Sequence, residues 1–448
     1  MGMPALDNTS LFRPDGTFRL DPSLVPGRHR PRKLFVRDLP PEPAGTKRRR
    51  WAPDGAMWNR VLTGILSGEK VPRQRVPSEK AWERARELAI MGDPLADDFA
   101  ALYPKLGYPK ARAMLDTALD HGIEKVEDAP EALRLLFAEL DSVPAWVDWE
   151  RVERGAAAMR RYAPLSWLFA RLAFAQTYVN ANAGMPLYMT GSLGEKTVAR
   201  RLKETSRWRL GIQQPGALRR SGDGFRTVVR VRVLHSLVRY HLLKMGKWDT
   251  ASLGMPIPQL DMAGANIGMF MTHSYLLAAL GAVMTPGEYA DVMHLWRYHG
   301  HLIGVVDDLN PKSFADLGRI GTLMTLTTRN AFDPRAKALT QSTMNARLRE
   351  DEGTLGRILD GIDIHASHGF YRLANGRKFF DRMELDPARQ WLWFAPAVFP
   401  AVFAADTARR FMPGGRRIAD RIGRRYIDNR LQVRETREAP FRPYHMGA

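Results

Sequence analysis

One histidine of this 448-residue chain lies on an apolar helical stripe between two arginines. The segment FRTVVRVRVLHSLVRYHLLK, residues 225–244, has helical periodicity, and steps of about 100° per residue place Arg232, His235 and Arg239 on one face. A neutral imidazole can ligate a metal, whereas two buried guanidiniums need anionic partners. A haem would meet both needs through its iron and its propionates. The alternative is an ordinary core histidine.

A second segment, MTGSLGEKTVARRLKETSRW, begins with a glycine-containing turn and continues as a helix. Arg201, Glu204 and Thr205 share one face of this helix, at spacings of three and four residues. Spacing alone favours an ordinary surface ion pair, in which Arg201 binds Glu204 or Glu195.

A third segment, HLWRYHGHLIGVVDDLNP, offers a possible non-haem metal cluster made of His294, His299, His301, Asp307 and Asp308. No HExxH or EF-hand spacing is present to support it. The alternative is helix packing, in which the two glycines of the segment allow neighbouring helices to approach closely. Helix packing is the favoured interpretation.

Composition excludes several classes of site. The chain has no cysteine, which rules out disulfides, zinc ribbons, iron–sulfur clusters, thiolate haem ligation and cysteine nucleophiles. Hydrophobic residues make up 45% and charged residues 26%, an ordinary globular balance. Met262–Gly287 has no charged residue and is long enough to cross a bilayer, but its polar residues favour a buried helix of a large bundle.

The periodicity predicts an all-α fold with a basic extended arm at each end. Residues 1–54 form a Pro-rich basic arm, residues 55–430 the helical domain and residues 431–448 a C-terminal tail. A capping box at Thr285–Glu288 predicts a helix that begins at Pro286, and Asp148 is the expected N-cap of a long helix. The expected helices are 78–91, 109–119, 129–140, 149–182, 195–208, 225–246, 257–284, 286–304, 312–329, 353–375 and 416–427.

The formal net charge of +19 is concentrated at the two ends: RHRPRK and KRRR both lie within residues 1–60, and residues 406–448 hold eleven arginines and five acidic residues. These arms suit peripheral contact with an anionic membrane surface, while a solvated flexible tail is the simpler interpretation. No nucleic-acid-binding module is visible, so no specific nucleic acid partner is expected. No signal peptide can be read, and a cytoplasmic location is therefore the expectation.

Together these segments resemble the latex-clearing-protein and MpaB-like oxygenases, which are haem-b proteins with a globin-like helical core. The resemblance rests on four stretches: VPAWVDW at 143–149, TGSL with RRLKET between 190 and 205, RVRVLHSLVR at 230–239, and HLWRYHGHLIGVVDDLNP at 294–311. It covers residues 55–310 clearly and the rest of the chain loosely.

The resemblance implies a role for each candidate residue. His235 corresponds to the proximal iron ligand, Arg232 and Arg239 to arginines beside the haem, and Arg201 and Thr205 to residues on the distal side. Rubber-cleaving members carry a lysine just before that threonine, and here the position is Glu204. A carboxylate cannot act as a neutral amine ligand, so the resting iron site is expected to be open. The resemblance makes Glu204 the first candidate for the general base and Glu195 the second.

The implied function is oxidative cleavage of a carbon–carbon double bond. The substrate class is apolar and isoprenoid-like, either a small molecule or a polyisoprenoid, with dioxygen as co-substrate. Two alternatives come from other classes: a haem-binding sensor or carrier without turnover, and a non-haem metal enzyme that uses His294, His299 and His301.

Overall fold

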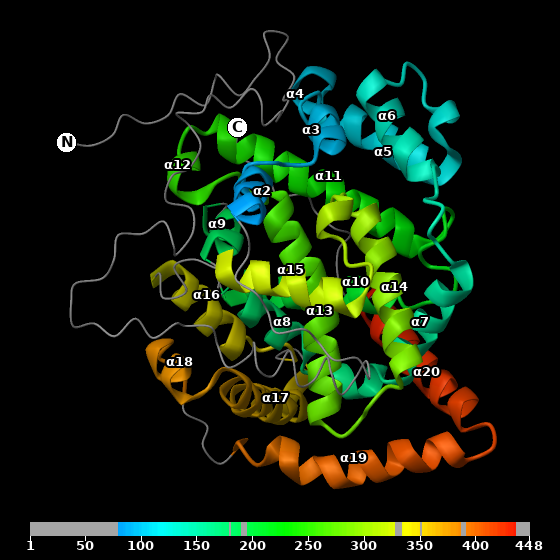
Figure 1. Cartoon of the computed structure of the whole chain (residues 1–448), viewed down its shortest axis with the longest axis vertical. Helices are drawn as coiled ribbons and strands as arrows, with labels where there is room; N and C mark the ends of the chain where they lie inside the picture. The colour runs from blue at the N-terminus through cyan, green and yellow to red at the C-terminus, as the bar shows by residue number, and fades with distance from the viewer. Residues whose placement is uncertain are drawn as a thin grey trace.

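The computed structural model describes residues 79–178, 181–189, 195–327, 334–349, 352–386 and 391–435, and these are helical with no strand. The prediction of an all-α fold is confirmed (Figure 1). The predicted arm at 1–54 lies outside the described residues.

In chain order the α-helices are α2 (Glu79–Ala89), α3 (Pro94–Ala100), α4 (Tyr103–Leu106), α5 (Tyr108–His121), α6 (Glu131–Asp141), α7 (Trp149–Arg161), α8 (Phe169–Tyr178), α9 (Ala181–Met189), α10 (Glu195–Gly211), α11 (Asp223–Lys244), α12 (Thr250–Leu253), α13 (Gln259–Ala279), α14 (Pro286–Leu302), α15 (Phe314–Thr327), α16 (Pro334–Asn345), α17 (Gly353–Asn375), α18 (Arg377–Arg382), α19 (Phe394–Phe411) and α20 (Gly415–Glu435).

Helix α13 runs through the centre of the bundle (Figure 1). It packs against α2, α8, α14 and α15, and buries Met262, Ile267 and Phe270. The uncharged stretch that begins at Met262 is therefore a buried helix followed by a turn, as predicted. Within the described ranges, no helix combines the length and apolarity that a bilayer crossing needs.

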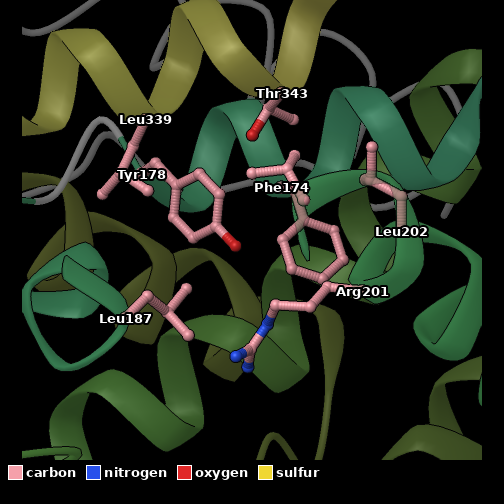
Figure 2. A pocket seen from close by; sticks show the side chains of 8 residues that line it. Phe174, Tyr178, Leu187, Arg201, Leu202, Leu339 and Thr343 are labelled. Carbon is pink, nitrogen blue, oxygen red and sulfur yellow. The ribbon is translucent and has the colours of Figure 1, made fainter. Parts of the chain in front are cut away.

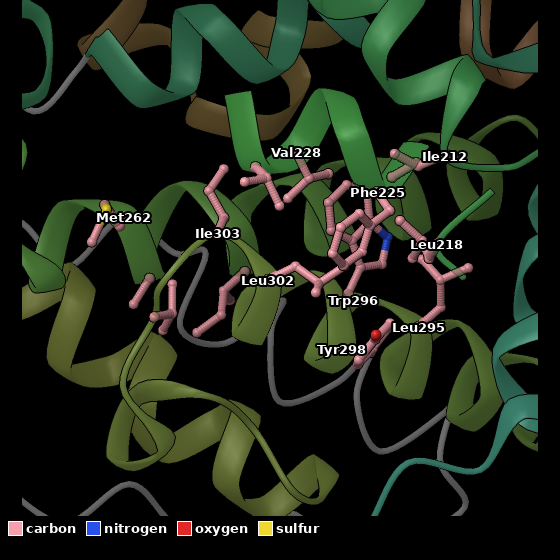
Figure 3. Close-up of a cluster of buried hydrophobic side chains, with 14 of the residues drawn as sticks. Ile212, Leu218, Phe225, Val228, Met262, Leu295, Trp296, Tyr298, Leu302 and Ile303 are labelled. Atoms are coloured by element: carbon pink, nitrogen blue, oxygen red, sulfur yellow. The ribbon is translucent and has the colours of Figure 1, made fainter. Parts of the chain in front are cut away.

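The largest apolar core joins α11 to α14. Figure 3 shows Phe225 and Val228 of α11 in the same cluster as Leu295, Trp296 and Leu302 of α14. Each of these side chains is at most 2% exposed. Burial of such a side chain contributes roughly 1.5–3 kcal/mol, so this contact holds the two helices together by a large area of apolar surface.

Both predicted helix starts are present. The Thr285 hydroxyl accepts a hydrogen bond from the Glu288 amide at 3.2 Å, and the Thr285 amide donates to the Glu288 carboxylate at 2.8 Å. Asp148 caps α7 by accepting from the amides of Glu150 and Arg151 at 2.9 and 3.1 Å. These side chains satisfy amides that have no partner within the helix.

The single long helix predicted over 149–182 is wrong. Helix α7 ends at Arg161, a 3-10 turn covers Ala163–Ser166, and α8 begins only at Phe169. Pro164 explains the break, since it lacks an amide hydrogen and its ring clashes with the preceding turn of a continuing helix. The turn redirects the chain, so that α8 packs against α13 and α16 while α7 packs against α14.

The C-terminal part contains two helices that differ from expectation. Helix α19 forms in the apolar segment although Pro400 lies inside it, on an exposed position of the helix. Helix α20 continues to Glu435 and so crosses the predicted domain end at residue 430. It packs against α7 and α10, which ties this segment to the bundle.

Candidate functional site

His235 lies in the middle of α11 with a half-buried ring whose Nδ1 atom is buried and has no hydrogen-bond partner. Burial lowers its pKa to about 4, and the charges of Arg239 and Arg201 act in the same direction. The imidazole is therefore neutral at pH 7. A neutral imidazole with an unused nitrogen is the form that can ligate a metal ion.

Arg232, one turn before His235, is enclosed by carboxylates. Its guanidinium donates to both oxygens of Asp93 at 2.6 and 3.0 Å, and to Glu139 at 2.6 Å. The Arg232 side chain is 2% exposed. Burial alone would lower its pKa, but the two negative charges outweigh burial and the net pKa of Arg232 is raised.

Arg239, one turn after His235, is 0% exposed and pairs with Asp97 of α3. Its guanidinium also donates to the carbonyls of Pro256 and Ile257, at 2.9 and 2.6 Å, and to the Ser236 hydroxyl at 3.2 Å. Burial raises the pKa of Asp97 to about 6, and Arg239 opposes that rise. At pH 7 the pair is still an ion pair.

These contacts correct the expectation that Arg232 and Arg239 pair with haem propionates. Every guanidinium nitrogen of both residues already donates to a carboxylate, hydroxyl or carbonyl of the protein. Sequence reasoning missed the partners Asp93 and Asp97, which bracket the first turn of α3. The available signal was that Asp93 and Asp97, four residues apart, lie on one face of their helix, as Arg232 and Arg239 do on α11.

Arg201 lines a pocket whose other walls are mostly apolar. Figure 2 shows its guanidinium and the Tyr178 hydroxyl pointing into the same space. The remaining lining residues come from α8, α9, α10 and α16, and are Phe174, Leu187, Val198, Leu202, Leu339 and Thr343. The charge of Arg201 also reaches His235, whose pKa it lowers. The structure thus brings Arg201 and His235 into one neighbourhood.

Glu204 forms a different ion pair from the one expected. Its carboxylate lies 3.6 Å from Arg200, one turn earlier on α10, and the Glu204 side chain is 39% exposed. Thr205 is half-buried on the same helix. Glu195, the other candidate base, begins α10.

The three histidines of α14 do not form the predicted metal cluster. Among the described residues, no group of three or more His, Asp or Glu side chains is arranged to hold a metal ion. His294 accepts a hydrogen bond from the Asp148 amide at 3.0 Å, while His299 bonds through Nδ1 to the Asn266 side chain at 2.7 Å. His301 stacks on Tyr298. Their roles are in packing, as the favoured interpretation held.

The partners of Asp307 and Asp308 also differ from those a metal site would require. Asp307 pairs with Arg297 and Lys312, and Asp308 pairs with Arg84. Both carboxylates therefore have cationic partners within the chain.

The sequence and fold of this chain are similar to those of known oxygenases. A family model described as "ER-bound oxygenase mpaB/B'/Rubber oxygenase, catalytic domain" matches residues 159–438. A rubber oxygenase of Streptomyces sp. (strain K30) is 22% identical over 309 residues, which are 66% of this chain and 70% of that protein. A solved structure of latex clearing protein LCP in the closed state superposes with a TM-score of 0.58 at 20% identity, over 76% of this chain and 90% of that one.

The Arg239–Asp97 pair predicts a large loss of stability when one partner is removed. Arg239→Gln should lower the free energy of unfolding by about 3–5 kcal/mol in protein without haem, because it leaves a buried carboxylate unpaired. Arg319→Gln is the control, since its pair with Asp316 is largely exposed and should cost under about 1 kcal/mol. Urea unfolding measures both, and equal losses would contradict the structural role of Arg239.

His299 predicts a pH dependence of stability. Burial lowers the pKa of His299 from 6.5 to about 3, so the folded state favours the neutral ring. The contribution of His299 to the free energy of unfolding is therefore complete above pH 6.5 and is lost as the pH falls toward 3. His299→Gln keeps a polar contact for Asn266 but does not titrate. Between pH 6 and 4 the unfolding free energy of this variant should fall less steeply than that of the wild type, by up to about 1.4 kcal/mol per pH unit. Identical slopes would show that His299 is not buried in its neutral form.

Proposed function

Because the chain belongs to the family of mpaB and rubber oxygenases, we propose that it is a haem-dependent oxygenase that cleaves a double bond of an apolar, unsaturated molecule. The observation that carries the haem assignment is the neutral imidazole of His235, with its buried and unpartnered nitrogen. Its ring is half-buried, which leaves an edge that a ligand can reach. The fully buried His273 offers no such edge.

The neutral imidazole fits a haem, and His235 is the residue that would hold its iron. Bound haem b would supply the activation of dioxygen, the co-substrate. The ion pairs of Arg232 and Arg239 keep the imidazole in place from both sides along α11. These arginines therefore act as positioning residues, and the cationic partners of any haem carboxylate must come from elsewhere in the chain.

We propose that the mostly apolar walls beside Arg201 form one part of the alkene site. Phe174, Leu187 and Leu202 provide an apolar wall that would exclude water from the reacting double bond. Arg201 adds one cationic donor at the edge of this wall. An isoprenoid or polyisoprenoid chain, the substrate class suggested by the name of the rubber oxygenase relative, has the matching apolar surface.

Glu204 is proposed as the group that accepts an allylic proton from the substrate, with Thr205 beside it on α10. The support is its place on the helix that also carries Arg201. Its carboxylate is one of the two on this helix segment that the sequence offers for proton transfer, Glu195 being the other. The ion pair with Arg200 is the competing, purely structural role.

His235→Ala tests the iron ligand. Protein expressed with added haem should show a Soret band, and this substitution should abolish the band or reduce haem content at least about tenfold, because the axial bond is lost. His241→Ala, on the last turn of the same helix, is the matched control and should keep the wild-type spectrum. An unchanged Soret band in His235→Ala would contradict the assignment. A normal band without oxygen uptake on any polyisoprenoid would instead indicate a haem carrier.

Glu204 variants separate the two roles of that carboxylate. Glu204→Gln should keep haem and lose on the order of 10²-fold or more of turnover, because general base catalysis is removed. Glu204→Lys should shift the spectrum toward a six-coordinate form and slow azide binding. Arg200→Gln removes only the ion pair and should leave turnover near the wild-type value. If Glu204→Gln behaves like Arg200→Gln, the carboxylate is structural.

A further inference from the structure

Arg209, near the end of α10, is a buried cation that has no carboxylate partner among the described residues. Arg209 is only 3% exposed, and its Nε and Nη1 atoms are buried without any hydrogen-bond partner. Its Nη2 donates to the Ser166 hydroxyl at 2.8 Å, and the guanidinium carbon lies 4.3 Å from the centre of the Phe169 ring. Neither contact neutralises the charge.

Four other buried arginines of the described chain have a carboxylate partner, and among them Arg160 has Asp420. Arg171, 1% exposed, donates to three backbone carbonyls and pairs with Asp363. Arg232 and Arg239 have carboxylate partners within hydrogen-bond distance. A buried ion without a counter-ion costs several kcal/mol, so a protein keeps one only where another group supplies the opposite charge.

A second unpartnered group lies beside Arg209. His273 of α13 is 0% exposed, and both of its ring nitrogens are buried without a hydrogen-bond partner. Burial lowers its pKa to about 3, and the charge of Arg209 adds to this effect. The ring of Phe169 contacts both, since the His273 ring centroid lies 5.9 Å from its own.

The chemistry of this cluster selects its ligand. The Nε and Nη1 atoms of Arg209 offer three N–H donors, and the neutral His273 ring offers one more together with one acceptor. Arginine nitrogens in a planar fork match the two oxygens of a carboxylate. Burial also lowers the pKa of Arg209 to about 10, which still leaves the guanidinium charged at pH 7.

We propose that Arg209 and His273, with Ser166, form a buried binding site for a carboxylate, located where α8, α10 and α13 meet. The carboxylate belongs either to a haem propionate or to a separate small acid. The site itself does not depend on the proposed oxygenase function, and only the propionate source rests on it. In either case the bound carboxylate supplies the negative charge that the described residues around Arg209 do not.

The first test measures thermal unfolding of haem-free protein with and without sodium acetate. Acetate should raise the unfolding midpoint of the wild type more than that of Arg209→Met, because only the wild type binds it in the folded state. Arg209→Met should also have an unchanged or higher midpoint without acetate, since an unpaired buried charge has been replaced by an apolar side chain. Arg171→Met is the matched control and should have a clearly lower midpoint.

An equal response of the wild type and Arg209→Met to acetate would overturn the proposal, whatever their midpoints without it. Should Arg209→Met fail to fold, Arg209→Lys replaces it. That variant keeps the charge but lacks the fork, so its response to acetate should be smaller than that of the wild type. A response equal to that of the wild type overturns the proposal in the same way.

The second test identifies the source of the carboxylate through titrations with haem and with haem dimethyl ester, whose propionates are blocked. If the site holds a propionate, Arg209→Met should weaken haem binding by about tenfold or more and leave the affinity for the ester unchanged. If it holds a separate acid, haem affinity should not change while the acetate effect is still lost. Failure of wild-type protein to bind any haem would refute the oxygenase proposal and leave the acetate result standing.

Discussion

The contact between α3 and α11 is the constraint on which the candidate site depends. Asp93 and Asp97 on one side meet Arg232 and Arg239 on the other, and both ion pairs are almost completely buried. Buried pairs contribute little net stability compared with apolar side chains, but separating them is costly. These pairs therefore fix the rotation of α11 about its axis and its position along that axis relative to α3. They thereby also fix the direction of the His235 ring, which lies between the two arginines along the helix.

The interior thus contains two kinds of buried cation. Those on α11 are neutralised by carboxylates of the chain and serve to hold the imidazole. Arg209 on α10 is neutralised by nothing among the described residues, and His273 beside it also lacks partners. Buried polar groups in a close-packed interior normally have hydrogen-bond partners. Because Arg209 and His273 lie next to the proposed haem helix and lack such partners, a ligand with a carboxylate would complement both.

Much of the fold could be predicted from local signals. The capping box at Thr285 and the cap at Asp148 depend on residues three positions apart or fewer, and both are present. The partners of Arg232 could not be predicted in this way, because Asp93 is 139 positions away in sequence. The same limit applies to Arg209, which in sequence is one more arginine of a basic run. Burial, which only the tertiary structure defines, separates it from its neighbours.

Two sequence patterns were each compatible with two interpretations, and the sequence alone did not identify the partners of these residues. Three histidines close together on α14 left a metal site open as the less favoured interpretation, and they pack instead against Trp146, Trp208 and Tyr298, with His294 and His301 both against Trp146. The two arginines around His235 suggested an anionic cofactor, and the anions proved to be aspartates and a glutamate of the protein. In both cases the residue types were informative, but the partners depended on packing between distant helices.

A crystal structure of the haem-loaded protein tests the central claim most directly. We predict continuous density between the His235 imidazole and the iron, with Arg232 still on Asp93 and Glu139, and Arg239 still on Asp97. Iron bound to His273 or His299 instead, or Arg232 and Arg239 turned away from their aspartates toward the propionates, would contradict the account.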